Sequence, residues 1–295
     1  MKILNSYKNG NALITLFEDG TRIIDYPDNE KLNVDYPLSI DLCICKKCPY
    51  GCQFCYNNST PNGKLGDIMG LKFIDTMVAG EEVAIGGGSV TQHPDLKPFL
   101  RKLKDKGLIA NITVSQSEFI DEVNTINDLI EEELIHGLGV SFKEPNDLLY
   151  KSVCENDNCI VHLIAGVHGK DVFDYLSKFN AKVLILGYKD LQRGALYRKT
   201  QTDIDEKIEW LRDNLEAYID KFALVSLDNL AIKQLNPQGF IKGEDWEHIY
   251  QGDDGNISFY VDAVEGTCHQ SSLETKAYEL KDDIKEMFKM IKESR

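Results

Sequence analysis

The chain has 295 residues and a formal net charge of −15, because 48 acidic residues outnumber 33 lysines and arginines. Its length suits one barrel-sized domain or two small ones, and a composition of 42% hydrophobic and 27% charged residues is ordinary for a globular protein. An acidic surface argues against a duplex nucleic acid as a partner, since nucleic acid requires a basic footprint. No apolar run is long enough to span a membrane, and residues 1–7 lack the apolar core of a signal peptide, so we predict a cytoplasmic protein.

Residues 1–37 are predicted to form a small β-hairpin extension. Apolar residues alternate in 12–17 and in 21–26, and Asp19-Gly20 between them is a hairpin signal. Asn9-Gly10 marks an earlier turn. We expect this extension to cover one end of the domain that follows.

From residue 38 onward, predicted strands alternate with predicted helices. The strands are expected over 38–45, 82–86, 108–115, 135–142, 160–166, 181–187, 222–227 and 257–263. The helices are expected over 72–79, 95–105, 117–133, 146–153, 170–178, 203–220, 229–235 and 272–293. Apolar, β-branched strands that alternate with helices indicate a parallel sheet. We therefore predict an α/β fold in which residues 38–295 form a partial or complete (β/α) barrel of the TIM type, with the site at the carboxyl ends of its strands.

The most informative stretch follows the first of these strands. Cys48, Cys52 and Cys55 have the spacing C-x3-C-x2-C. Three thiolates this close on one loop can hold three corners of a cubane iron–sulfur cluster, and the missing fourth cysteine leaves one iron open to another ligand.

Two further cysteines, Cys43 and Cys45, share one face of the strand that precedes the loop. They are either buried apolar fillers or residues that bear on the cluster. The role of Cys268 does not follow from the sequence.

The segment Cys48-Pro-Tyr-Gly-Cys52-Gln-Phe-Cys55 resembles the signature loop of the radical S-adenosylmethionine (SAM) enzymes. This resemblance implies a [4Fe–4S] cluster held by the three cysteines, with SAM on the fourth iron. It also implies reductive cleavage of SAM to methionine and a 5′-deoxyadenosyl radical, which takes a hydrogen atom from a substrate. An electron donor such as flavodoxin or ferredoxin is expected as a partner.

A glycine turn after the second strand supports the resemblance. Within residues 83–95, His93-Pro-Asp95 aligns with the His-Pro-Asp that commonly follows the family's Gly-Gly-Glu-Pro turn. Gly87 and Gly88 then take the places of the two glycines, and Ser89 takes the place of the glutamate. Glycines let backbone carbonyls approach the amino group of SAM closely, whereas Ser89 departs from the motif.

The resemblance assigns further SAM contacts to Phe54 and to the ends of later strands. Ser115 and Ser141 correspond to polar side chains that contact the ribose and carboxylate, although Ser115 is equally a helix N-cap. Ile164-Ala-Gly166 partly resembles an adenine-contact motif, with core packing as the alternative. Candidates for substrate contacts, with Tyr260 as a possible radical relay, are Lys189, Arg193, Asp228, Asn229, Tyr260 and Asp262. His168 and His269 are expected at the surface or in loops, and no residue is assigned as catalytic.

Three alternatives remain open at this point. We expect an uncharacterised branch of the family that acts on an unidentified substrate. Two alternatives are a small-molecule substrate, as in the carboxy-deazaguanine synthases, and a protein side chain, as in the activases of glycyl-radical enzymes. The alternative of another class is a non-catalytic protein whose cysteines hold zinc or a structural iron–sulfur cluster. The second C-x2-C or H-x3-H half of a zinc site is absent from the sequence.

Overall fold

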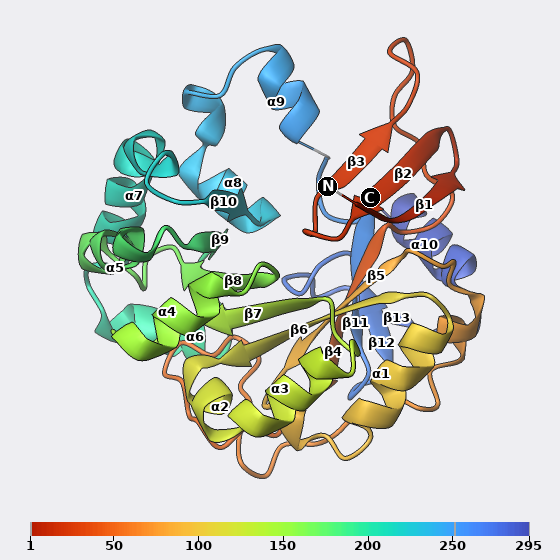
Figure 1. The fold of residues 1–295 in the computed structure, drawn as a ribbon, viewed down its shortest axis with the longest axis horizontal. Coiled ribbons are helices and arrows are strands. Elements are labelled where there is room, and N and C mark those ends of the chain that lie inside the picture. Colours follow the sequence, from red (N-terminus) through yellow and green to blue (C-terminus); the bar gives the residue numbers. More distant parts are fainter. Residues whose placement is uncertain (1, 251, 295) are drawn as a thin grey trace.

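The structure is a computed structural model that describes residues 2–250 and 252–294 (Figure 1). Its N-terminal part is an antiparallel sheet of β1 (Ile3–Asn9), β2 (Ala12–Phe17) and β3 (Arg22–Asp25), in that order. The predicted hairpin is therefore confirmed, and β1 adds a third strand before it. Ala12, Ile14 and Leu16 are buried and alternate with less buried residues, and Ala12 and Ile14 join the main apolar core, which anchors this sheet to the rest of the chain.

The second sheet has ten strands and forms the centre of the molecule. A parallel series runs in chain order through β4 (Ser39–Cys45), β5 (Glu82–Gly87), β6 (Ile109–Ser115), β7 (Gly137–Ser141), β8 (Cys159–Ile164), β9 (Lys182–Leu186) and β10 (Leu224–Leu227). On the free side of β4 lies the parallel β11 (Ser258–Asp262), followed by the antiparallel β12 (Thr267–His269) and β13 (Tyr278–Glu279). The predicted α/β fold is confirmed. Within the described residues β10 and β11 do not pair with each other. Of the two predicted forms, the parallel strands therefore make a partial barrel and not a closed one.

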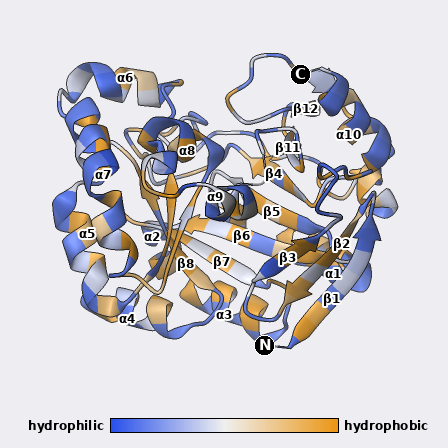
Figure 2. Ribbon diagram, turned by 90° about the horizontal axis from the view of Figure 1, so that it is seen from above, coloured by the Kyte–Doolittle hydropathy of each residue, from blue (hydrophilic) through white to orange (hydrophobic). Residues whose placement is uncertain are grey.

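Most of the helices lie around the outside of these strands (Figures 1 and 2). They are α1 (Leu96–Asp105), α2 (Gln116–Asp121), α3 (Val123–Glu131), α4 (Asp147–Glu155), α5 (Lys170–Leu176), α6 (Arg193–Thr200), α7 (Ile204–Ile219), α8 (Asn229–Leu235), α9 (Glu244–Ile249) and α10 (Ile284–Glu293). Short 3-10 helices span Lys72–Thr76, Val90–Gln92, Ser177–Phe179 and Pro237–Gly239. No helix in the described part of the chain is long and apolar enough to cross a membrane.

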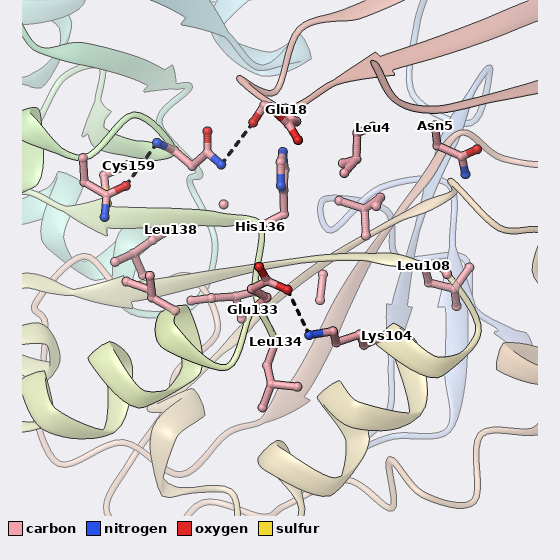
Figure 3. Close-up of a pocket in the computed structure, with 18 of the residues that line it drawn as sticks. Leu4, Asn5, Glu18, Lys104, Leu108, Glu133, Leu134, His136, Leu138 and Cys159 are labelled. Carbon is pink, nitrogen blue, oxygen red and sulfur yellow. Dashed lines mark hydrogen bonds and ion pairs between the residues drawn. The ribbon is translucent and has the colours of Figure 1, made fainter. Parts of the chain in front are cut away.

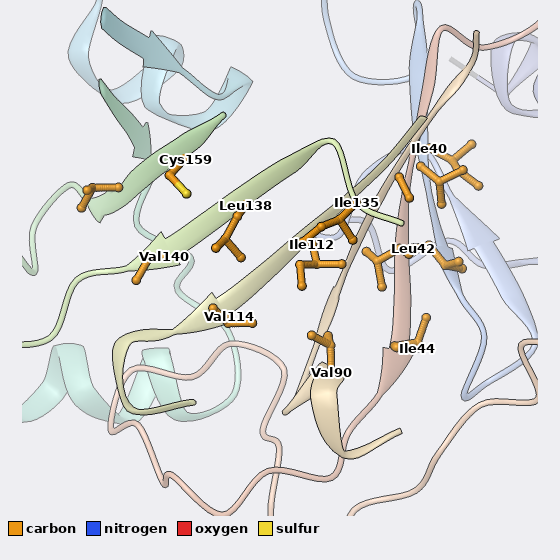
Figure 4. Close-up of a cluster of buried hydrophobic side chains, with 14 of the residues drawn as sticks. Ile40, Leu42, Ile44, Val90, Ile112, Val114, Ile135, Leu138, Val140 and Cys159 are labelled. Carbon is orange, nitrogen blue, oxygen red and sulfur yellow. The ribbon is translucent and has the colours of Figure 1, made fainter. Parts of the chain in front are cut away.

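The two faces of the parallel sheet differ in character. On β4, Ile40, Leu42 and Ile44 are at most 1% exposed and belong to one apolar cluster with residues of β6, β7 and the helices (Figure 4). The intervening positions on the same strands are polar or small, such as Asn111 and Ser141. One face is therefore core, and the other is free for polar side chains that lead to the strand ends.

Several predicted helices differ from the structure. The helix expected over 117–133 is divided at Glu122 into α2 and α3. The two helices bury residues of different kinds: α2 buries the polar Gln116 and Glu118, whereas α3 buries the apolar Ile126 and Leu129. The expected helix over 72–79 is only a 3-10 helix, Lys72–Thr76, before the chain becomes extended at residue 77.

The C-terminal helix expected over 272–293 is also shorter. Residues 278–279 pair as β13 with β12, and the helix begins at Ile284, where the Asp283 side chain accepts the Glu286 N–H over 3.0 Å. The helices α6 and α9 were not predicted.

Candidate functional site

The cysteine loop leaves the carboxyl end of β4 and folds back beside it. The Cys48 N–H donates to the Thr60 carbonyl over 2.8 Å, and the Thr60 N–H donates to the Lys46 carbonyl over 3.0 Å. The Lys46 N–H donates in turn to the Lys64 carbonyl over 2.8 Å. These main-chain bonds fix the segment that carries the three cysteines at the strand end where it was predicted.

The three thiols are free and only partly buried. Burial raises the pKa of the Cys48 thiol, and the neighbouring Cys52 and Cys55 raise it further. Burial likewise raises the pKa of Cys52, again with a contribution from Cys55. Three accessible, mutually interacting soft donors on one loop fit an iron–sulfur cluster, whose metal charge stabilises the thiolate form. No group of three or more His, Cys, Asp or Glu side chains in the described ranges is arranged around a single metal ion.

The glycine turn after β5 contacts this loop through its backbone. Gly88 N–H donates to the Cys45 carbonyl over 2.7 Å, and Ser89 N–H donates to the Lys47 carbonyl over 2.8 Å. A Cβ on Gly87 would lie 2.4 Å from the Cys45 oxygen, and one on Gly88 would lie 2.1 Å from the Lys47 oxygen. The glycines are thus needed for the cysteine loop to approach, which is a reason for them besides the predicted approach of SAM.

Ser89 is buried and hydrogen-bonded to a carboxylate that the sequence analysis missed. Its Oγ donates to Glu118 Oε1 over 2.9 Å, and the Thr91 N–H and Oγ1 donate to the same oxygen over 3.0 and 2.8 Å. Glu118 is 1% exposed, and burial raises its pKa against the lowering effect of these bonds. The turn therefore has an acidic neighbour, although residue 89 itself is not acidic.

A sequence signal for Glu118 does exist. Ser115-Gln-Ser-Glu118 has the form of a capping box, and Ser115 Oγ accepts the Glu118 N–H over 3.1 Å at the start of α2. Ser115 thus has the N-cap role that was its alternative, while its contact with SAM stays a prediction.

The remaining predicted cofactor residues follow along adjacent strand ends. Ser141 ends β7 directly beside Ser115 of β6. Ile164 ends β8, and its N–H donates to His168 Nδ1 over 2.8 Å. His168 was expected at the surface or in a loop; it lies in the loop after β8 but is buried, because it closes this turn and packs edge-on against Phe142.

Three of the candidates for substrate contacts have structural partners. Asp228 accepts the Ala231 N–H over 2.7 Å as the N-cap of α8, and Asn229 donates to Asp254 over 2.7 Å. Asp262 pairs with Lys46 at 3.0 Å. These contacts explain the three side chains without a ligand.

Two other candidates reach the cysteine loop. Lys189 Nζ lies 3.9 Å from the ring centre of Tyr56 and donates to Ser272 Oγ over 2.7 Å. Arg193 Nη2 donates to the Ser59 carbonyl over 2.6 Å. The segment after β9 therefore contacts the cysteine loop through both of these side chains.

Cys43 and Cys45 are 3% and 0% exposed, as expected for buried fillers. Burial raises the pKa of the Cys43 thiol, which interacts with the hydroxyl of Tyr260 and the amide of Asn57. Cys268 is buried in the same apolar core as Cys45.

A cavity of about 680 Å³ lies at the opposite ends of the strands (Figure 3). Its lining includes the starts of β6, β7 and β8 together with Leu4 of β1 and Glu18, which follows β2. His136 Nε2 and Asn158 Oδ1 are buried there without a hydrogen-bond partner in the described ranges. None of the predicted site residues lines this cavity.

The fold defined by the parallel series β4–β10 is shared with solved structures. No protein-family model and no curated protein matches the sequence. The chain is similar to Streptococcus suis SuiB bound to S-adenosylmethionine (TM-score 0.56, 13% identity), to SuiB bound to its precursor peptide SuiA (0.58, 14%) and to SuiB alone (0.53, 14%).

These matches cover 86% of this chain and 64%, 65% and 66% of SuiB, so the chain spans slightly less than two thirds of that protein. At 13–14% sequence identity, these matches show that the two proteins share a fold and nothing more. The fold that the predicted resemblance implies is therefore confirmed.

Proposed function

We propose that this protein is a radical SAM enzyme that binds a [4Fe–4S] cluster through Cys48, Cys52 and Cys55. The observation that carries the proposal is the backbone contact between the cysteine loop and the Gly87-Gly88 turn, at the carboxyl ends of two paired parallel strands. Support comes from the fold shared with SuiB, one structure of which is bound to S-adenosylmethionine.

The bound cluster and SAM would supply radical chemistry that begins with one-electron cleavage of SAM. The chain's own residues position these groups. Gly87 and Gly88 allow the loop to sit against β5, and Glu118 holds the turn at Ser89. The SAM contacts that we propose are Phe54 in the cysteine loop, Gly87, Gly88 and Ser89 in the glycine turn after β5, and Ser115, Ser141 and Ile164 at the ends of β6, β7 and β8.

For the substrate, we favour a peptide or protein side chain over a small molecule. The specific observation is the fold similarity to SuiB in complex with its precursor peptide SuiA, at a TM-score of 0.58. An electron donor such as flavodoxin or ferredoxin is part of the proposal, as are a cytoplasmic location and a division into an extension (1–37) and a barrel domain (38–295).

The proposal is tested by anaerobic reconstitution with iron and sulfide, followed by reduction and addition of SAM. We expect about four irons per chain and formation of 5′-deoxyadenosine and methionine, measured by mass spectrometry. Cys52→Ala should lose both properties, whereas Cys154→Ala, a partly buried cysteine on α4, should keep them.

Two results would contradict the assignment. The first is SAM cleavage that persists in Cys52→Ala. The second is a wild-type protein that binds zinc, or a cluster that does not respond to SAM, which would favour the structural metal protein.

A further inference from the structure

Arg193, the first residue of α6, has an unexplained N–H group at the cysteine loop. Its Nη2 donates to the Ser59 carbonyl, but its Nε is buried and has no acceptor among the described residues. A buried donor without a partner is destabilising, and most such groups in proteins are satisfied. We therefore expect that the Arg193 Nε–H group finds its acceptor only when a ligand is bound at the cysteine loop.

The position of Arg193 is fixed by several contacts around it. The Tyr188 hydroxyl donates to the Gly194 carbonyl over 2.7 Å, and a Cβ on Gly194 would lie 2.3 Å from the Lys189 oxygen. One turn further on, Tyr197 packs edge-on against Phe54, with ring centres 5.8 Å apart. The start of α6 is thus tightly packed against the loop, and the guanidinium group is held in place.

The N-terminus of α6 also lies beside the backbone between Cys52 and Cys55. A Cβ on Gly194, the residue after Arg193, would lie 3.5 Å from the Phe54 oxygen. Together with the hydrogen bond from Arg193 to Ser59, this contact places the start of α6 at the cysteine loop. A positive side chain from a different strand end therefore lies against this loop in a chain with a net charge of −15.

We propose that Arg193 is a positioning residue for the iron–sulfur cluster, with Nη2 holding the loop at Ser59 and Nε donating a hydrogen bond to a sulfur of the bound cluster. This inference rests on the proposed function. A cluster becomes more negative by one charge when it takes one electron from an external one-electron reductant. A fixed cation and an N–H donor stabilise that reduced form more than the oxidised form, so Arg193 raises the reduction potential.

The test is a redox titration of reconstituted protein without SAM, followed by electron paramagnetic resonance. Arg193→Gln removes the positive charge and the guanidinium donors, whereas Arg193→Lys keeps the positive charge and removes the planar guanidinium with its Nε donor. Arg198→Gln is the matched control, because Arg198 lies on the same helix but pairs with Asp205. We expect the equilibrium constant for reduction to fall at least tenfold in Arg193→Gln, or about 59 mV for a one-electron couple. Arg193→Lys should show a smaller fall, and Arg198→Gln none.

A wild-type potential in Arg193→Gln, measured with a full complement of cluster, overturns the inference and leaves the proposed function intact. If Arg193→Gln does not retain its cluster, Arg193→Lys decides: a lower potential supports the inference and an unchanged one overturns it. Failure of the wild-type protein to form a [4Fe–4S] cluster would overturn the proposed function and this inference together.

Discussion

Replacing Gly88 with alanine should displace the cysteine loop, whereas the same change at Gly86 should not. A Cβ on Gly88 would lie 2.1 Å from the Lys47 oxygen, whereas a Cβ on Gly86 would have no neighbour within 4 Å. A carbon–oxygen contact needs roughly 3.0 Å, so the Lys47 carbonyl must move by about 1 Å. That movement disrupts the bonds from Ser89 N–H to Lys47 and from Gly88 N–H to Cys45.

Two disrupted buried hydrogen bonds and the overpacking together lower the free energy of unfolding by about 2–4 kcal/mol. Urea denaturation of the metal-free proteins measures this loss. Gly88→Ala should also bind less iron after reconstitution, because Lys47 adjoins Cys48, while Gly86→Ala should stay within about 0.5 kcal/mol of wild type. Equal stability and equal iron content in the two variants would refute the reasoning.

Two further predictions concern buried carboxyl groups. Ser89→Ala removes one of three hydrogen bonds to Glu118 Oε1, so urea denaturation at pH 7 should show a loss of about 1–2 kcal/mol; unchanged stability would mean that Thr91 alone satisfies this oxygen. Burial raises the pKa of Glu81 from 4.5 to about 8, with the Val78 N–H opposing the shift. The folded protein therefore holds this proton more tightly, and the stability that Glu81 contributes below about pH 4.5 is lost as the pH rises to about 8. Glu81→Gln should remove up to about 4 kcal/mol of the fall in stability between pH 5 and pH 8, and identical slopes in the two proteins would contradict this.

The positions of the cysteine loop and the glycine turn could be predicted from the sequence, because the alternation of strands and helices along the chain determines them. Residues 38–45 and 82–86 are short, apolar and separated by one crossover, so parallel pairing brings the cysteine loop and the glycine turn to one edge. Glu118 was harder to find, because its role depends on Ser89 and Thr91, which lie on a different strand connection.

The elements that were missed are those without an apolar periodicity of their own. Residues 193–200 bury only Gly194, so nothing in their pattern indicates the helix α6, whose place is set by contacts such as Phe54 with Tyr197. In the same way, residues 278–279 become a strand only because Cys268 lies opposite Tyr278. Tertiary contacts decide both cases, and local propensity does not.

The main-chain bonds of the cysteine loop have a consequence for how the protein matures. Because Cys48 is tied to Thr60 and the glycine turn is tied to Cys45 and Lys47, the conformational entropy of this loop is lost when the polypeptide folds. Cluster binding then orders little additional backbone. The free energy of binding to the thiolates is therefore not reduced by the entropy cost of ordering the loop. Assembly in the cell would accordingly proceed in two stages, with a finished apoprotein serving as the acceptor for cluster delivery.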